Sequence, residues 1–187
     1  MFVEWKIAAE AIWFILPAYI ANSSAVVVGG GAPIDFGKTW RGKRIFGDGK
    51  TWRGFFGGIL IGMAAGVVMN ILAPGTFYSG FPSIIILFSI SFGALSGDII
   101  ESFFKRQIGK KSGEKWIIAD QIDFLLGSFL FSFLASTVLY RISMIDGNWF
   151  LQSFSVWHIA FLLILTPALH YLTNIVGYIA GLKEVPW

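Results

Sequence analysis

Acidic residues occur where two apolar segments in the middle of the chain meet a basic loop. If the first segment continues as a helix, Asp98, Glu101 and Lys105 share one face because they are three or four residues apart. Asp120 and Asp123 repeat the i, i+3 spacing in the second segment. A carboxylate inside a bilayer is costly, at roughly 2.5–3.5 kcal/mol for Asp at a helix centre and less near the ends. The two polar faces therefore predict a site that compensates for this cost.

Two interpretations of these carboxylates follow from their chemistry. Carboxylate oxygens are the ligands that Mg²⁺ prefers, and in a two-metal site the ions would lie roughly 3.5–4 Å apart. The alternative is that Asp98 pairs with Lys105 or Arg106 and that the later aspartates cap the next helix. We favour the metal site because three aspartates are expected to converge at one membrane face. The predicted Mg²⁺ ligands are Asp98, Asp120 and Asp123.

The composition places the chain in a membrane. Of its 187 residues, 56% are hydrophobic, 17% are aromatic and only 13% are charged, which is too few charges to cover a soluble globule of this size. The absence of cysteine excludes thiol catalysis, disulfides and zinc–thiolate sites. A net charge of +3 does not argue for a nucleic acid, and we expect no such partner. No linker or low-complexity run interrupts the sequence, so we expect a single domain over 1–187.

Five apolar segments approach the roughly 20 residues that a helix needs to cross a bilayer. We therefore predict an all-α integral membrane protein with five transmembrane helices, at about 7–29, 54–73, 83–104, 124–141 and 157–180. Apart from Lys6 and Arg141, every Lys and Arg falls on one side, in two basic loops and the C-terminal tail. The positive-inside rule makes that side cytoplasmic, with the N-terminus outside and the C-terminus inside. We expect a multi-pass cell-membrane protein whose site lies at the cytoplasmic face, and its odd number of helices suggests a homodimer.

One six-residue string, GKTWRG, occurs twice in the first basic loop, at 37–42 and at 49–54. The preference of membrane proteins for basic loops explains the charges but not their repeated order. The string GKT is typical of a P-loop, yet that motif requires glycine at positions where this chain has Ala32 and Arg44. We therefore exclude a P-loop site.

Both copies of the string carry groups that bind phosphate well. Arginine presents a planar fork to phosphate oxygens, lysine presents a point charge, and glycine lets backbone amides approach a ligand. The second copy also opens an apolar helix, whose free N–H groups near Thr51 add positive character. We interpret the loop as a polyphosphate cradle, and the alternative is a loop held against anionic lipid headgroups. The cradle residues are Lys38, Arg41, Lys50 and Arg53.

Other polar residues near the repeat have less specific interpretations. Asn22 follows Pro17, so it either binds a base or a phosphate or satisfies backbone groups that the proline frees. Asp35 and Asp48 flank the two copies, where they could orient the guanidinium groups or reach a metal, but we expect each to be a solvated loop carboxylate. Acidic metal ligands, a basic cradle and apolar walls at one membrane face together indicate a reaction between a phosphorylated lipid and a water-soluble phosphate compound.

Four motifs carry a resemblance to a known family. They are PAYIAN at 17–22, the paired GKTWRG, GDIIESFFKR at 97–106 and DQIDF at 120–124. In combination they resemble the CDP-archaeol synthases, archaeal membrane cytidylyltransferases that are similar to the larger CDP-diacylglycerol synthases. The resemblance covers nearly the whole chain. It implies an Mg²⁺-dependent transfer of CMP from CTP to the phosphate of digeranylgeranylglyceryl phosphate, an unsaturated diether lipid, which gives CDP-archaeol and pyrophosphate in phospholipid biosynthesis.

The roles of the residues follow from this expected reaction. The lipid phosphate oxygen attacks the α-phosphorus of CTP, so catalysis consists of positioning and charge neutralisation, and no protein nucleophile or general base is needed. Lys105, beside the predicted metal site, is counted with the three aspartates as catalytic. The predicted substrate-binding residues are Asn22, Lys38, Arg41, Lys50, Arg53 and Arg106.

Two other function classes remain as alternatives. CDP-alcohol phosphotransferases also use intramembrane aspartates, but their DGxxAR motif is absent, because Asp48-Gly49 is followed by KTWR. A small anion transporter would carry charges near the bilayer midplane and an internal repeat of helices. In this chain the charges gather at one face and the repeat is confined to a loop.

Overall fold

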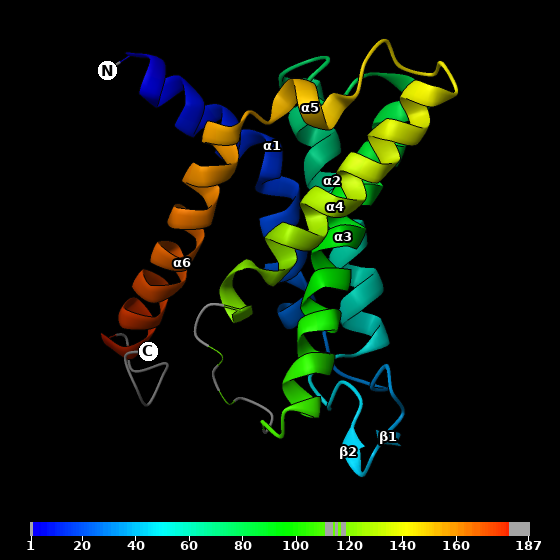
Figure 1. Ribbon diagram of the computed structural model, residues 1–187, viewed down its shortest axis with the longest axis vertical. Coiled ribbons are helices and arrows are strands. Elements are labelled where there is room, and N and C mark those ends of the chain that lie inside the picture. Colours follow the sequence, from blue (N-terminus) through cyan, green and yellow to red (C-terminus); the bar gives the residue numbers. More distant parts are fainter. Residues whose placement is uncertain (1, 111–113, 115, 117–118, 180–187) are drawn as a thin grey trace.

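The computed structural model describes residues 2–110, 114, 116 and 119–179. Within this part of the chain, long helices run alongside one another, and a small β-hairpin lies at the end of the molecule opposite the N-terminus (Figure 1). The elements are α1 (Phe2–Val27), β1 (Thr39–Trp40), β2 (Lys43–Arg44), α2 (Trp52–Leu72), α3 (Gly80–Gln107), α4 (Ala119–Arg141), α5 (Trp149–Ser153) and α6 (Val156–Ile179). The predicted all-α architecture is confirmed, with the hairpin as its one addition among the described residues.

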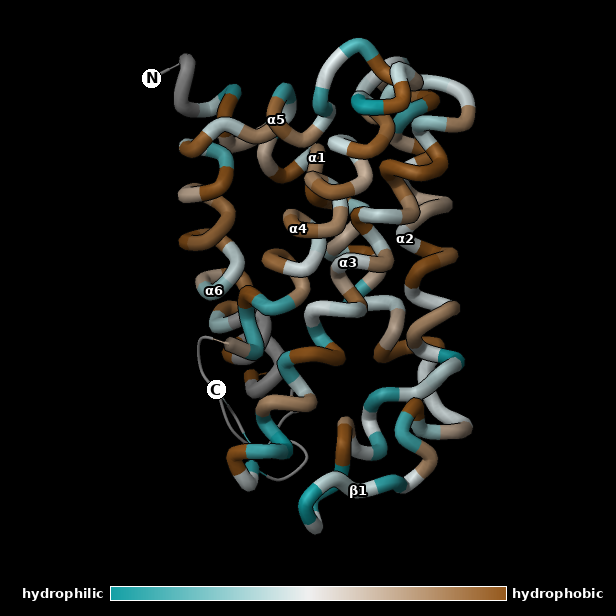
Figure 2. Tube along the Cα trace, turned by 45° about the vertical axis from the view of Figure 1, so that its right-hand side comes forward, coloured by the Kyte–Doolittle hydropathy of each residue, from teal (hydrophilic) through white to brown (hydrophobic). Residues whose placement is uncertain are grey.

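Four helices of the described chain are long and apolar enough to cross a membrane. Hydrophobic residues dominate the middle of the bundle and hydrophilic ones collect toward its two ends (Figure 2). The four helices are Trp5–Val27 of α1 and the whole of α2, α3 and α4. The expected fifth span corresponds to α6, in which the apolar part that the structure describes, Val156–Leu169, is shorter than the other four.

Helix α3 is the central element of the bundle. It packs against α1, α2 and α4, and a larger share of its apolar stretch is buried than in any other candidate span. Glycines allow its close contact with α4, because a Cβ on Gly93 would lie 2.9 Å from the Cα of Ser128, and one on Gly127 would lie 2.9 Å from the Cα of Gly97. Small residues of this kind let helix backbones approach closely in membranes. This glycine seam fixes α3 against α4 where the two helices carry their carboxylates.

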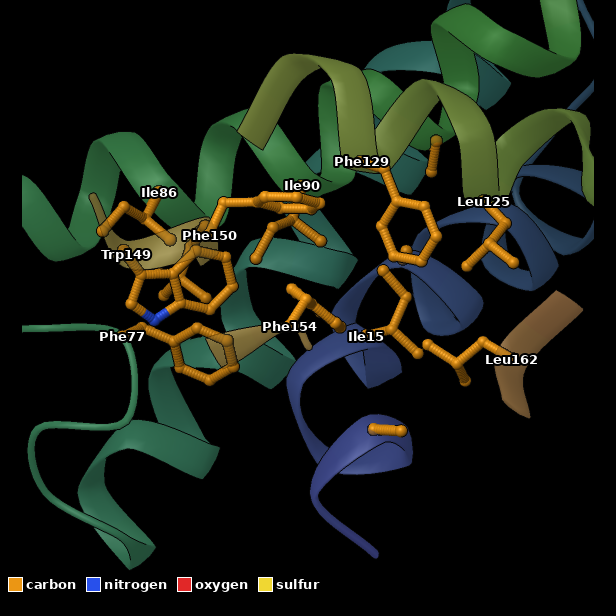
Figure 3. Packing of buried hydrophobic residues seen from close by; sticks show 14 of the residues in the cluster. Ile15, Phe77, Ile86, Ile90, Leu125, Phe129, Trp149, Phe150, Phe154 and Leu162 are labelled. Carbon is orange, nitrogen blue, oxygen red and sulfur yellow. The ribbon is translucent and has the colours of Figure 1, made fainter. Parts of the chain in front are cut away.

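Aromatic side chains fill the end of the bundle away from the hairpin. Trp149 and Phe150 of the short α5 pack with Phe77, Phe129 and Phe154 (Figure 3). The Trp149 indole N–H donates to a backbone carbonyl at 2.7 Å, so the polar atom of this buried ring is satisfied. These rings close one end of the bundle, and the polar site lies at the other.

Candidate functional site

Two adjoining cavities lie at the hairpin end of the bundle, with volumes of about 430 and 230 Å³. Both are lined by Gly49, Lys50 and Asp98. The Lys50 Nζ atom lies 2.7 and 2.6 Å from the two carboxylate oxygens of Asp98, so this ion pair stands between the cavities. A ligand that spans both cavities therefore passes this pair.

The smaller cavity gathers the carboxylates that the sequence placed on two helical faces. The expected convergence is found, because α3 and α4 both continue to the mouth of the bundle and the glycine seam holds them together. Lysine and arginine line the same cavity, so charges of both signs face a space of only 230 Å³. Its lining consists of Phe46, Gly49, Lys50, Asp98, Glu101, Ser102, Lys105, Arg106, Asp120 and Asp123.

Lysines hold two of these carboxylates. Lys105 Nζ lies 2.8 and 2.6 Å from the oxygens of Asp120, which also accepts the backbone N–H of Trp116 at 3.1 Å. Asp98 is paired with Lys50, 48 positions away in the sequence, rather than with Lys105 or Arg106 as the ion-pair alternative proposed. Asp98 and Asp120 are thus each neutralised by a lysine from another segment and not from their own helix.

Glu101 is a member of this cluster to which the sequence reasoning assigned no role. Its side chain is only 8% exposed and lies 3.8 Å from Lys105 Nζ, one helical turn away. Its Oε1 atom is buried and has no hydrogen-bond partner among the described residues. The i, i+4 spacing of Glu101 and Lys105 on a polar face was the signal that could have identified it. An unsatisfied buried carboxylate oxygen is a ready acceptor for an incoming ligand or ion.

Arg106 lies between the cavity and the hairpin loop. One of its terminal nitrogens donates to the carbonyl oxygen of Lys110 at 2.6 Å, and its Nε atom is buried without a hydrogen-bond partner among the described residues. A Cβ on Gly47 would lie 3.6 Å from that Nε atom, an ordinary van der Waals distance, so Gly47 lies directly beside the guanidinium. The hairpin loop therefore forms the roof over Arg106.

The acidic lining suits Mg²⁺ in its chemistry but is not arranged as a ready metal site. Within the described ranges, no three acidic, His or Cys side chains are grouped closely enough to hold a metal ion. The cavity nevertheless presents four carboxylates, and hard oxygen donors are what Mg²⁺ prefers. Lys50 and Lys105 occupy the oxygens of Asp98 and Asp120, so a cation bound by these two aspartates would replace the ammonium groups.

The larger cavity combines apolar walls with groups that favour an anion. Asn22 of α1 lines it, together with the glycine run 29–31 and the start of α2. Thr51 is the N-cap of α2, and its side chain accepts the N–H of Gly54 at 3.1 Å. A helix N-terminus with Lys50 beside it favours negative charge. Asp48 also lines this cavity, and apolar side chains from three helices and the preceding loop complete the lining: Ala25, Val26, Ile34, Phe55, Leu95 and Ile99.

The two copies of GKTWRG adopt different structures. The first forms the β-hairpin, with Trp40 paired to Lys43 and with the left-handed Arg41 (φ 52°) and Gly42 (φ 76°) in the turn between them. The second supplies the N-cap and first turn of α2. Within the two copies, only Lys50 among the basic residues lines a cavity. Lys38, Arg41 and Arg53 are exposed and line neither, so their placement does not support the predicted phosphate contact.

Asp35 is buried, which corrects the expectation of a solvated loop carboxylate. Its oxygens accept N–H groups from Arg44 at 2.8 Å and from the backbone of Gly37, Phe46 and Gly47 at 2.9–3.0 Å. Burial alone would raise the pKa of Asp35, but these hydrogen bonds outweigh it and hold the pKa below its ordinary value. Asp35 therefore organises the hairpin that covers the smaller cavity. Asp48 does remain exposed, and it pairs with Arg44 at 2.7 Å.

Comparison with known proteins gives a consistent result. The family model described as "CarS-like: CDP-archaeol synthase" matches residues 5–187. The CDP-archaeol synthase of Pyrococcus abyssi is 44% identical over 179 residues, which cover 95% of this chain and 97% of the relative. That of Methanocorpusculum labreanum is 45% identical over 177 residues, 92% of this chain and all of the relative. A solved structure described as "Structural insight into an intramembrane enzyme for archaeal membrane lipids biosynthesis" is similar with a TM-score of 0.71 and 32% identity, covering 90% of this chain and 94% of that one.

Proposed function

Since this chain belongs to the CDP-archaeol synthase family, we propose that its two adjoining cavities are the site of the family's cytidylyl transfer. The reaction moves CMP from CTP to the phosphate of digeranylgeranylglyceryl phosphate and releases pyrophosphate. One observation carries the assignment: a cavity lined by four carboxylates shares Lys50 and Asp98 with a larger, partly apolar cavity. Reacting phosphates at this junction would meet charges of both signs.

We assign the nucleotide to the larger cavity. Its volume of about 430 Å³ falls within the range typical of small-molecule sites. The start of α2 and the ammonium of Lys50 would receive the triphosphate, and Asn22 would hydrogen-bond a base or a phosphate. The triphosphate would then point toward Asp98 and the smaller cavity.

In the proposed mechanism, an oxygen of the lipid phosphate forms a bond to the α-phosphorus of CTP while the bond to pyrophosphate breaks on the opposite side. The lipid phosphate is already ionised near neutral pH, so no proton must be removed from it. The chain therefore has to align the two substrates and neutralise charge, which is the general requirement of phosphoryl and nucleotidyl transfer. Lys50, Lys105 and Arg106 are the cations within reach of the junction.

Magnesium is part of this proposal. Asp98, Asp120 and Asp123 would hold Mg²⁺, which when bound would neutralise phosphate oxygens. The lysines paired with Asp98 and Asp120 would transfer to the phosphates as the substrates enter, so that neither an ammonium nor a carboxylate is left unpaired. Glu101 would remain a partner of Lys105 within α3 when Lys105 leaves Asp120.

The finer topology also remains a proposal. We propose a single catalytic domain whose fifth span is α6, with the N-terminus outside and both cavities at the cytoplasmic face. The distribution of basic residues supports this orientation, since all the Lys and Arg that the structure describes, except Lys6 and Arg141, lie on the side of the cavities. An odd number of spans is also the basis for proposing a homodimer.

Pyrophosphate release by the purified protein in detergent tests the function. We expect release only when CTP, Mg²⁺ and the diether glycerol phosphate are all present, and much less with ATP, GTP or UTP. Release without the lipid would indicate nucleotide hydrolysis. No release from folded protein with any nucleotide would contradict the proposal and would favour the alternative of an anion transporter.

A further inference from the structure

An exposed row of aromatic rings continues from a membrane-spanning helix onto the hairpin loop. The Phe56 and Trp52 rings of α2 are stacked with their centroids 5.7 Å apart, and the Phe36 ring follows at 6.5 Å from Trp52. Phe36 is 63% exposed although it lies outside the helices. Phe56 and Trp52 lie on a candidate transmembrane helix, so the row leads directly from the lipid-facing surface to the hairpin.

The backbone presents two of the exposed side chains at a conformational cost. Phe36 has φ 47° and Arg41 has φ 52°, both in the left-handed region where glycine and asparagine are preferred. Hydrogen bonds around Asp35 hold the first of these positions, because Gly37 N–H donates to its carboxylate and Lys38 N–H to its backbone carbonyl. Both side chains are exposed, so burial in the protein does not explain a large side chain at either position.

The basic residues of this region separate into two groups. Lys43 donates to the carbonyl of Gln107 and Arg44 pairs with Asp35, so these two cations serve the fold. The other group consists of Lys38, Arg41 and Arg53, which are exposed and form no side-chain hydrogen bond or ion pair with any residue that the structure describes. Three unpaired cations thus accompany a row of exposed rings.

We propose that this surface is a membrane anchor that binds anionic phospholipid headgroups of the surrounding bilayer. Phe36, Trp52 and Phe56 enter the boundary between headgroups and chains, where aromatic rings are favoured, and the three cations bind headgroup phosphates. Each Lys or Arg near an anionic surface strengthens attachment roughly fivefold. The occupant is bulk anionic lipid and not the substrate, because none of the three cations lines either cavity.

The anchor has a direct connection to the site. Arg44, which ends β2, is fixed by Asp35, and two residues later Phe46 lines the smaller cavity. Gly47 then lies above Arg106. A hairpin held at the bilayer surface therefore keeps Phe46 and Gly47, which cover the smaller cavity, at the level of the lipid phosphates.

A depth measurement tests the anchor without relying on catalysis. The chain has no cysteine, so Thr39→Cys offers a single labelling position on the exposed β1 strand. A spin label there is examined in vesicles of phosphatidylcholine alone and of phosphatidylcholine with about one third phosphatidylglycerol. We expect the anionic vesicles to lower the accessibility of the label to a water-soluble relaxation agent by at least about threefold.

Variants that suit the local backbone make the test decisive. Arg41→Asn and Phe36→Asn place asparagine where left-handed backbone prefers it, so the hairpin is expected to keep its fold. Combined with Lys38→Gln in one chain, these two substitutions should abolish the difference in label accessibility between the two vesicle types. Arg141→Gln, which removes an exposed cation at the opposite end of the bundle, is the matched control and should leave the difference unchanged. Equal accessibility in both vesicle types for the unsubstituted hairpin, or no effect of the three hairpin substitutions, would overturn the proposal.

Discussion

Gly97 of α3 lies directly against the peptide backbone of Asp123 in α4. A Cβ on Gly97 would lie 2.9 Å from the carbonyl carbon of Asp123 and still closer to its oxygen. No side chain fits at this contact, and Asp98 follows Gly97 in the sequence. The positions of two proposed metal ligands therefore depend on the absence of one methyl group.

Gly97→Ala should separate the two helices beside the site. Overpacking of this kind costs typically about 1–3 kcal/mol, and a displacement of about 1 Å at a reacting centre can lower the rate about 100-fold. We expect turnover, measured as pyrophosphate release, to fall strongly, whereas the melting temperature should change little. Gly57→Ala is the control, because its added Cβ meets only the side chain of Val28. Equal activity of the two variants would show that the close contact does not position the carboxylates.

Asp120→Asn and Asp123→Asn should each lower turnover by roughly 100-fold, because each removes a proposed ligand of Mg²⁺. The decisive measurement is a titration of the rate with Mg²⁺. In both variants the Mg²⁺ concentration that gives half of the maximal rate should rise, and the maximal rate should fall. Asp146→Asn, which changes an exposed carboxylate that lines neither cavity, is the control. Full turnover in both site variants would remove the metal assignment.

Lys105 neutralises both Glu101 and Asp120, so its removal should destabilise the protein. Breaking a buried ion pair by deleting one partner costs roughly 3–5 kcal/mol, since the other charge is left uncompensated. We expect Lys105→Met to lower the melting temperature in detergent, and we expect Glu101→Gln in the same chain to restore part of the loss. Strictly additive effects of the two substitutions would contradict a coupling between them.

Asp35 should make the hairpin sensitive to acid. Its pKa in the folded protein is lowered from an ordinary value of 3.8, so its contribution to stability is complete above that value and is lost as the pH falls toward the lower folded pKa. Hydrogen exchange of peptides covering 36–47, corrected for the intrinsic effect of pH, should rise below about pH 4. Asp35→Asn should raise exchange at neutral pH and remove the acid dependence. An unchanged exchange rate in that variant would show that other contacts hold the hairpin.

The fifth span can be tested by labelling from either side of the membrane. Val156 and Ile179, at the two ends of α6, are 71% and 77% exposed. If α6 crosses the bilayer, Val156→Cys should react with a membrane-impermeant reagent only from outside, and Ile179→Cys only from the side that also labels Thr39→Cys. Reaction of both α6 positions from one side would replace the five-span topology with four.

Periodicity was enough to predict the acidic half of the site. Asp98 and Glu101, like Asp120 and Asp123, share a helical face because of their spacing, and the membrane context made it reasonable that the faces meet. The partner of Asp98 could not be predicted in this way, since Lys50 is brought to it by the packing of α2 on α3. Long-range pairs of this kind depend on tertiary contacts that local patterns do not encode.

The basic half of the site was harder to predict, because two identical sequence strings led us to expect the same phosphate-binding role for both. Lys38 and Lys50 occupy equivalent positions in the two copies, yet only Lys50 reaches a cavity. The difference comes from the flanks: Asp35 ties the first copy into a hairpin, whereas Thr51 caps a helix that the following apolar residues continue. The role of Asp35 depends on hydrogen bonds to positions as far as Gly47, which become visible only in the fold.

The duplicated hexapeptide also bears on how the chain enters the membrane during synthesis. Nothing within GKTWRG tells the insertion machinery which copy begins a transmembrane helix. A helix starting after Thr39 would carry Arg41, Lys43, Arg44 and Asp48 into the bilayer, at roughly 2.5–3.5 kcal/mol for each at the helix centre. A helix starting after Thr51 carries only Arg53, close enough to its end to reach the headgroups. The lipid phase itself therefore selects the second copy, and the first is left at the surface to form the hairpin.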